Sequence, residues 1–367
     1  MGTVAIYLVV TFLAGLLAFV ARLPPLVGFL AAGFLINAAG VEHIDAIDTL
    51  ADLGVTLLLF GVGLKLELRT LLRKEVWLTT TVHMAASTVV GAALIATLAL
   101  LGFSLPADTD WSTLAVLGFA LSFSSTVLVV KVLEDRGETQ SNYGRIAIGV
   151  LILQDLAAVA FLAIAAGQAP TPWALALVGL IPLALVLRRI WDRIGHDELH
   201  VLFGVVVALV PGFALFEAVG LKGDLGAVVM GMLLASHPDA AELARDLFGL
   251  KEILLIGFFV SIGLTGLPTL ETVVLSALLL LVLPFKAAGY AALLWFMRLR
   301  PRTSVMAGIS LGNYSEFGLI VIAVGAASGL VDDHWLVVLS LSVALSFVIS
   351  AIVNSRGNSL SRQLVDR

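Results

Sequence analysis

The chain of 367 residues is 60% hydrophobic and only 13% charged, with a formal net charge of −5 and no cysteine. An ordinary soluble domain carries about a quarter charged residues, so the composition excludes a protein of that class. The missing cysteines exclude disulfides and thiol chemistry. Apolar runs of about 20 residues, each long enough to cross the hydrocarbon core as a helix, recur along the sequence. We therefore expect an all-α polytopic membrane protein.

Thirteen apolar runs lie between charged residues or breaks marked by proline and glycine, and each predicts one transmembrane helix. The first run follows no basic segment and ends without a convincing cleavage site, so we interpret it as a span and not as a signal peptide. Short stretches near 43–48 and 238–248 are expected to be surface helices or loops. The predicted helices 1 to 13 are 3–21, 25–40, 50–66, 76–102, 112–133, 142–167, 171–189, 199–219, 222–236, 251–266, 270–298, 302–329 and 333–354.

The positions of the basic residues predict the orientation of these helices. With the N-terminus outside and every helix crossing, 19 of the 21 Lys and Arg residues fall in inside loops or at inner helix ends. Only Lys222 falls outside, and Lys286 lies within a span. Because Lys and Arg gather on the cytoplasmic side, we expect a multi-pass protein of the cytoplasmic (inner) membrane with a cytoplasmic C-terminus.

Two pairs of similar motifs lie seven helices apart and predict an internal repeat. Residues 60–71 of helix 3 resemble 259–270 of helix 10, and the polar cluster 122–126 of helix 5 matches 312–318 of helix 12. An odd offset makes the second copy enter the membrane from the opposite side, as in the inverted repeats of secondary transporters. The expected division is two inverted six-helix repeats, 1–167 and 199–354, joined by a linking helix at 171–189.

Asp155 is the strongest candidate for function. It lies deep in an apolar run, where a charge costs about 2.5–3.5 kcal/mol on insertion scales. A buried carboxylate can exchange its proton for a small cation, since both neutralise the same charge. The preceding Gln154 offers an amide oxygen as a further ligand and an NH₂ group to orient the carboxylate. The alternative is a polar clamp between helices that carries no ion; the cost of burying an Asp favours the functional interpretation.

Polar clusters in helices 5 and 12 predict that both helices are discontinuous and cross at the midplane. Irregular backbone at membrane depth survives only where it is buried in protein or lines a cavity, and there its carbonyls and hydroxyls can bind an ion. The alternative is that Ser and Thr bond back to their own helix. We assign Ser124, Ser125 and Thr126 to the cation site, beside Ser122 in helix 5; Gly312, Asn313 and Gly318 mark the break in helix 12.

Two further ionisable groups remain within the predicted spans once loops and helix ends are set aside. Lys286 is expected to pair with a carboxylate or with helix carbonyls and to hold the site when the cation is absent; snorkelling to an interface is the competing interpretation. Glu316 lies beside Asn313 and Ser315 in the second break. It is either a supporting structural acid or part of the ion route.

The sequence gives little support for a zinc site or for a nucleotide-binding site. His196, Glu198 and His200 form a His-x-Glu-x-His string, which is not the His-Glu-x-x-His zinc helix. No Walker sequence and no Gly-x-Gly-x-x-Gly after a strand is present, which argues against ATP-driven pumping. We expect no cofactor, no catalytic residues, no nucleic-acid partner, and no metal other than a monovalent cation at Asp155.

These motifs resemble the membrane domain of Kef-type monovalent cation:proton antiporters, the potassium-efflux branch of the sodium/proton exchanger superfamily. The resemblance covers nearly the whole chain. Its most specific parts are 121–127, 144–145 with 153–155, 257–263 and 313–317, and Lys286 falls where the family carries a buried lysine.

The resemblance implies a secondary active antiporter, not an enzyme, that exchanges K⁺ in preference to Na⁺ for H⁺ by alternating access at Asp155. A Gln-Asp pair resembles the potassium-type site, and one central acid predicts electroneutral one-for-one exchange. The resemblance also implies a homodimer in which helices 5, 6, 12 and 13 move against a dimerisation domain. Two alternatives remain: a K⁺ channel or uniporter without proton coupling, and a sodium-coupled organic-anion symporter, for which no substrate pocket is identified.

Family members usually continue into a cytosolic nucleotide-binding domain, and we expect no such domain within this sequence, which ends at Arg367. A regulatory domain would then be truncated, supplied by a separate chain, or absent. Residues 237–252 occupy the place of the family's acidic regulatory loop without its usual pattern, so control by glutathione or a nucleotide is not expected.

Overall fold

The computed structural model describes residues 2–21, 23–65, 72–107, 109–139, 141–165, 177–195 and 198–355. The regular structure in these ranges is helical, as the composition predicted. The chain divides into two compact units that interleave along the sequence. The first unit comprises Met1–Val4, Glu42–Leu68 and Val159–Ser261; the second comprises Ala5–Val41, Arg69–Ala158 and Ile262–Arg367.

The first unit is a helical bundle with one irregular helix. A π-helical segment, Ala208–Ala214, joins two of its helices and contains Pro211. Proline has no backbone N–H to donate, and one irregular turn of this kind absorbs the lost bond. The helices of this unit are α3 (Asp45–Leu64), α10 (Leu180–Trp191), α11 (Glu198–Val207), α12 (Leu215–Ala218), α13 (Gly223–Leu234) and most of α14 (Ala240–Leu264).

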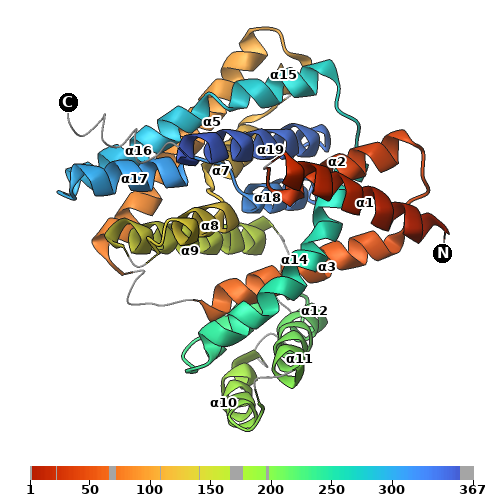
Figure 1. The fold of residues 1–367 in the computed structure, drawn as a ribbon, viewed down its shortest axis with the longest axis vertical. Coiled ribbons are helices and arrows are strands. Elements are labelled where there is room, and N and C mark those ends of the chain that lie inside the picture. Colours follow the sequence, from red (N-terminus) through yellow and green to blue (C-terminus); the bar gives the residue numbers. More distant parts are fainter. Residues whose placement is uncertain are drawn as a thin grey trace. The chain divides into compact units, whose positions relative to one another are not determined.

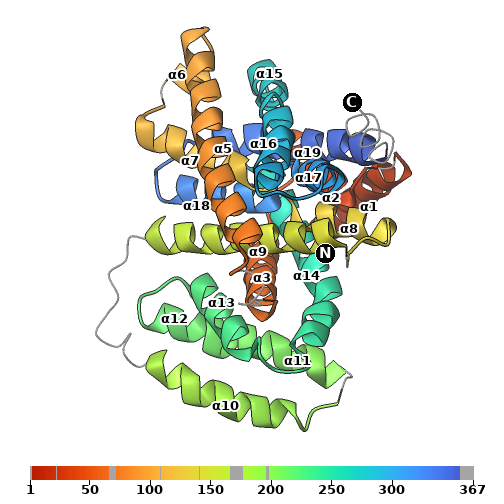
Figure 2. The ribbon, with the colours of Figure 1, turned by 90° about the vertical axis from the view of Figure 1, so that its left-hand side faces the viewer.

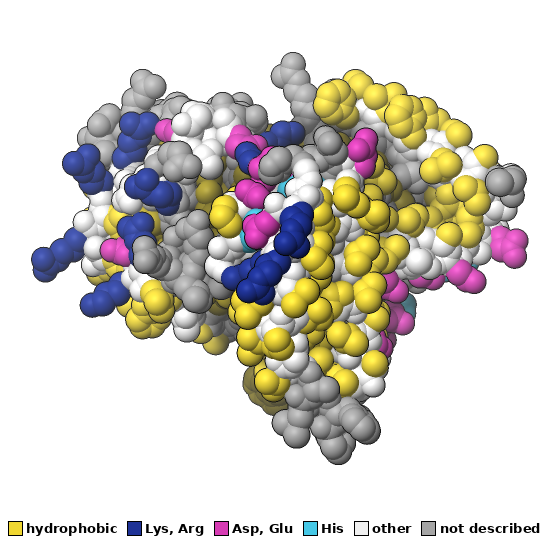
Figure 3. All heavy atoms as spheres, turned by 90° about the horizontal axis from the view of Figure 1, so that it is seen from below, with side chains coloured by type: hydrophobic (Ala, Val, Ile, Leu, Met, Phe, Trp, Pro, Cys, Tyr) yellow, Lys and Arg dark blue, Asp and Glu magenta, His cyan; other side chains and the backbone are white. Residues whose placement is uncertain are grey.

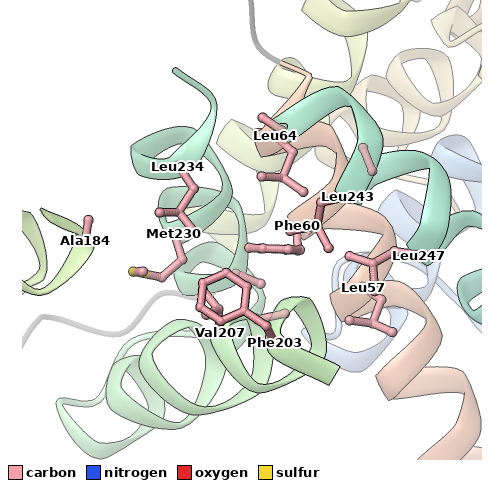
Figure 4. Close-up of a cluster of buried hydrophobic side chains, with 14 of the residues drawn as sticks. Leu57, Phe60, Leu64, Ala184, Phe203, Val207, Met230, Leu234, Leu243 and Leu247 are labelled. Atoms are coloured by element: carbon pink, nitrogen blue, oxygen red, sulfur yellow. The ribbon is translucent and has the colours of Figure 1, made fainter. Parts of the chain in front are cut away.

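The core of the first unit is apolar and draws on helices far apart in the sequence (Figure 4). Phe60 of α3 lies at its centre and is fully buried. Glycines bring two of the backbones together, since a Cβ on Gly231 of α13 would lie 2.4 Å from the Phe60 carbonyl oxygen and 2.9 Å from the Gly63 Cα. The other core side chains include Leu57, Phe203, Val207, Met230, Leu234, Leu243 and Leu247.

The second unit holds the remaining helices, and Figures 1 and 2 show two of them, α7 and α18, lying beside each other. Asp110 caps the N-terminus of α7, where the Thr113 backbone N–H hydrogen bond lowers the pKa of its carboxyl. The unit comprises most of α1 (Gly2–Val20), α2 (Pro25–Ala38), α5 (Lys74–Leu100), α6 (Ser104–Ala107), α7 (Trp111–Ser122), α8 (Thr126–Asp135), most of α9 (Asn142–Ala165), α15 (Leu270–Leu279), α16 (Val282–Phe296), α17 (Pro301–Leu311), α18 (Glu316–Ala327) and α19 (His334–Ser355).

Within the described residues, nine helical spans are long and apolar enough to cross a membrane when α7–α8, α11–α12 and α15–α16 each count as one, or ten if the bent pair α17–α18 is also one span. Each of the thirteen predicted ranges overlaps a helix, but α2 and α13 are shorter than a full span. The predicted linking helix at 171–189 is described only from residue 177. The structure therefore gives a polytopic helical membrane protein without fixing the count at thirteen.

Some predicted helix boundaries differ from the structure. α14 begins at Ala240 and not at 251, so most of the expected surface segment at 238–248 is its first turns. The run predicted at 270–298 is one candidate span, Leu270–Phe296, but it is interrupted at Leu280 and Leu281, where α15 and α16 meet. Pro284 causes this interruption, because it cannot donate to the carbonyl four residues earlier and its ring crowds that carbonyl.

Large apolar side chains are exposed over much of the surface (Figure 3). On α1, Leu8, Phe12 and Leu17 are 67%, 66% and 70% exposed. A soluble monomer rarely leaves so continuous an apolar face in water, whereas hydrocarbon solvates it well. The surface therefore agrees with the hydropathy of the sequence.

Replacing Gly231 with alanine is expected to destabilise the first unit by about 1–3 kcal/mol, because the added methyl group has no room against α3. A drop of several degrees in the melting temperature of the detergent-solubilised protein would show it. Gly249→Ala in α14 is the matched control, since nothing lies within 4 Å of its added Cβ. Equal melting temperatures for the two variants would contradict this packing.

Candidate cation-binding site

Both helices predicted to be discontinuous are broken in the structure. α7 ends at Ser122 and α8 begins at Thr126; α17 ends at Leu311 and α18 begins at Glu316, with a bend of 44°. Each second half starts with a serine cap. The Ser125 hydroxyl accepts the Leu128 N–H at 3.3 Å, and the Ser315 hydroxyl accepts the Phe317 N–H at 3.1 Å.

The alternative, in which these hydroxyls bond back to their own helix, holds for Ser122, which donates to the Phe119 carbonyl at 2.6 Å. At Ser125 the side chain instead takes over one of the N–H groups that a helix start leaves without a partner. The serine cluster therefore contains both kinds of contact, and the break itself lies at Phe123–Ser125.

The two breaks meet. The Ser124 hydroxyl donates to the Leu311 carbonyl at 2.8 Å, and the Ser125 N–H donates to the Asn313 side-chain oxygen at 2.7 Å. α7 packs against α18 while α8 contacts α17. Gly318 allows the close approach, since a Cβ there would lie 2.5 Å from the Ala120 carbonyl oxygen. The first half of each helix thus lies beside the second half of the other.

Asp155 of α9 lies at the start of α8. Its side chain is 3% exposed, and the Thr126 hydroxyl lies 3.4 Å from its Oδ2. Thr126 is the first residue of α8, and a helix N-terminus carries a partial positive charge that favours a carboxylate. The site therefore offers a buried negative charge and a hydroxyl oxygen, which together can hold a proton or a small cation.

Gln154 contacts the backbone of the break. Its Oε1 accepts the Ser124 N–H at 3.0 Å, and its Nε2 donates to the Ser122 carbonyl at 3.2 Å and to the Tyr290 hydroxyl at 2.7 Å. The NH₂ group predicted to orient Asp155 instead uses both of its hydrogens in these contacts. The physical reason is that successive side chains on a helix point about 100° apart. Gln154 thus replaces a missing helical bond.

Lys286 of α16 is fully buried, and its ammonium group donates to three backbone carbonyls. The acceptors are Leu121 at 3.0 Å, Phe123 at 2.5 Å and Asn313 at 2.8 Å. Of the two predicted partners, the structure has helix carbonyls. Two of them belong to the C-terminal end of α7, which is the negative end of the helix dipole. The ammonium also lies 5.1 Å from the Tyr314 ring centroid, within range of a cation–π contact.

Glu316 is the second buried acid of the site region. It is the first residue of α18, 3% exposed, with its Oε2 3.4 Å from the Ser315 hydroxyl. Like Asp155, it lies at the N-terminus of a half-helix. The structure thus places Ser315 and Glu316 at the α18 start, and Asn313 between the two breaks through its bonds to Ser125 and to the Ser310 carbonyl.

His83 and Tyr290 are not among the residues predicted for the site. His83 of α5 is 1% exposed, lies 2.9 Å from the Lys286 carbonyl through Nε2, and stacks on Tyr290 with ring centroids 3.4 Å apart. Both residues carried a signal: His83 is an ionisable group within an apolar run, and Tyr290 follows Lys286 by four residues on the same helix face.

The His-x-Glu-x-His string lies only partly within the described residues. His196 lies outside the described residues, and His200 is buried with its Nδ1 2.9 Å from an Asp246 carboxylate oxygen. In the described part of the chain, no three His, Cys, Asp or Glu residues are grouped so as to hold a metal ion.

Replacing Lys286 with alanine is expected to lower the free energy of unfolding by at least about 2 kcal/mol, because three buried carbonyls lose their donor. Thermal unfolding of the purified protein measures this. Lys131→Ala is the control, since Lys131 of α8 is exposed. A melting temperature for Lys286→Ala equal to that of the control would show that the contacts of Lys286 with the three carbonyls do not stabilise the fold.

Comparison with known proteins places the chain in a family. Residues 8–355 match the family described as "Sodium/hydrogen exchanger, transmembrane". The chain is 32% identical over 359 residues to the glutathione-regulated potassium-efflux system protein KefC of Enterobacter sp. (strain 638), covering 89% of this chain and 55% of that protein. It is also 32% identical over 359 residues to the putative cation/proton antiporter YbaL of Escherichia coli (strain K12), covering 89% of this chain and 62% of that protein.

The chain thus spans little more than half the length of these curated relatives. The solved structure of the sodium proton antiporter MjNhaP1 from Methanocaldococcus jannaschii shares its fold, with a TM-score of 0.64 and 14% identity, over 100% of this chain and 99% of that one. The chain belongs to the sodium/hydrogen exchanger family, a family of membrane transporters and not of enzymes.

Proposed function

We propose that this chain is a secondary active antiporter that exchanges a monovalent cation for H⁺ at Asp155. The observation that carries the proposal is the position of this carboxylate, 3% exposed and beside the Thr126 hydroxyl at the start of α8. A charge at this depth must be neutralised. A proton and a cation neutralise the same oxygens, so one displaces the other, and that competition couples the two fluxes.

The geometry of Lys286 supports electroneutral exchange. Its ammonium group is held by three backbone carbonyls, so its three hydrogens are used and none is left to donate to Asp155. One cation that replaces one proton at one carboxylate moves no net charge. K⁺ is the favoured cation, because the KefC relative is named for potassium efflux.

A pair of matching contacts supports the inverted repeat. A Cβ on Gly63 would meet the Val228 carbonyl oxygen at 2.4 Å and the Gly231 Cα at 2.9 Å; a Cβ on Gly263 would meet the Leu30 carbonyl oxygen at 2.6 Å and the Gly33 Cα at 2.7 Å. The first contact joins predicted helices 3 and 9, and the second joins helices 10 and 2. A shift of seven helices relates the two, as the repeat requires.

Several further features complete the proposal: thirteen spans, an outside N-terminus and a cytoplasmic C-terminus, alternating access at Asp155, and a homodimer in the cytoplasmic membrane. Inverted repeats support alternating access, because a transporter built from two opposed copies has two related states open to opposite sides. The distribution of Lys and Arg supports the orientation.

Reconstitution into proteoliposomes with a lumenal pH dye tests the exchange. Adding K⁺, Na⁺ or Li⁺ is expected to release or take up protons, most strongly with K⁺, with the membrane voltage clamped. Asp155→Asn is expected to lower this flux by at least about 100-fold, because a side chain that cannot ionise cannot exchange a proton for a cation. Asp333→Asn in an exposed turn is the matched control.

Retained cation-dependent proton flux in folded Asp155→Asn protein would remove Asp155 from the mechanism. K⁺ flux with no proton movement in the parent protein would instead indicate a channel or uniporter. Proton-independent flux that requires Na⁺ and an organic anion would indicate a symporter.

A further inference from the structure

We propose that Tyr290 and His83 are positioning residues for cation binding, which hold Gln154 across the break between α7 and α8 and so set the position of Thr126 against Asp155. The inference rests on the proposed function and identifies groups that act on its site without touching the ion. Both residues and all their partners below belong to the second unit.

Gln154 is the link between these residues and the break. Its amide bridges the Ser122 carbonyl and the Ser124 N–H, the two backbone groups on either side of Phe123. These two contacts use the amide oxygen and one of the two amide hydrogens. The Tyr290 hydroxyl supplies the third contact, accepting from Nε2 at 2.7 Å.

Tyr290 acts on the break through Gln154, whose Oε1 accepts the Ser124 backbone N–H at 3.0 Å. The Ser124 hydroxyl in turn donates to the Leu311 carbonyl of α17. Gln154, held by the Tyr290 hydroxyl, thus joins α9 to both broken helices through Ser124. Because Thr126 follows Ser124 by two residues, fixing Ser124 also fixes the hydroxyl that lies 3.4 Å from Asp155.

His83 fixes the position of the Tyr290 ring by stacking on it. The two rings are nearly parallel, at 15°, with centroids 3.4 Å apart. The His83 Nε2 lies 2.9 Å from the Lys286 carbonyl oxygen, which can only accept, so Nε2 carries the hydrogen. Nδ1 lies 3.3 Å from the Ser87 hydroxyl, and a neutral imidazole accepts from that hydroxyl there.

The α16 backbone leaves space for the His83 ring. A Cβ on Gly289 would lie 3.0 Å from the His83 ring, so glycine is the residue that lets the imidazole lie against the helix. Lys286 and Tyr290 are four residues apart and share a face of α16. By holding α16 at Lys286 and Tyr290, His83 orients the ammonium and the phenol together toward the break.

The test is Tyr290→Phe, which keeps the ring stacked on His83 and removes only the hydroxyl. Potassium-dependent proton flux in proteoliposomes is expected to show a KM for K⁺ raised about five-fold, as one lost hydrogen bond predicts, with the maximum rate changed less than two-fold. Tyr143→Phe is the matched control, since it removes a tyrosine hydroxyl that contacts Glu138 elsewhere in the unit; its KM is expected to equal that of the parent.

His83 is tested by a pair of variants. His83→Gln can still donate to the Lys286 carbonyl and accept from Ser87, whereas His83→Leu is of similar size and can do neither. We expect a KM near the parent value for the first and a rise like that of Tyr290→Phe for the second. A role in packing alone would give the opposite order or a loss of rate at unchanged KM.

A second measurement separates this inference from the proposed function. The K⁺ concentration that gives half-maximal thermal stabilisation of the purified protein reports binding without transport. If the parent protein shows no exchange, the proposed function fails, and the positioning role is still decided by whether Tyr290→Phe raises this concentration. Parent-like K⁺ dependence of Tyr290→Phe in both assays overturns the positioning role.

Discussion

The contact on which the site depends is that between the Lys286 ammonium and the carbonyls of Leu121, Phe123 and Asn313. Two helices broken within a membrane expose backbone carbonyls where no water can reach them, and each would cost several kcal/mol if left without a partner. A buried ammonium is equally unfavourable alone. The ammonium and the carbonyls satisfy each other's hydrogen bonds, and this contact stabilises both breaks.

The break in α7–α8 presents two helix ends of opposite partial charge, and a different side chain neutralises each of them. The C-terminal end of α7 meets Lys286, a charge held by three fixed oxygens. The N-terminal end of α8 meets Asp155, with the Thr126 hydroxyl 3.4 Å from its Oδ2. A transported ion must leave as readily as it enters, so the end held by a side chain of the protein suits a structural role, and the end beside Asp155 suits the proposed exchange.

Much of this site was predictable, because polar residues in apolar runs are costly and therefore informative. The serine cluster predicted the break in α7–α8, and Asn313 predicted the second. The direction of the Gln154 amide was not predictable, since its partner Tyr290 lies 136 residues away. His83 was missed for the same reason: its partner, the Lys286 carbonyl, belongs to the backbone and leaves no trace in the side-chain pattern.

The two breaks have equivalent capping residues, but the acid at each break comes from a different place in the chain. Ser125 and Ser315 are both N-caps, and Thr126 and Glu316 are both first residues of the half-helix that follows. In α18 the acid belongs to the helix whose end it faces, so the two move as one body. In α8 that position holds a hydroxyl, and the acid comes from α9. A site assembled from two helices can change its geometry when either helix moves, and the exchange proposed at Asp155 requires such a change.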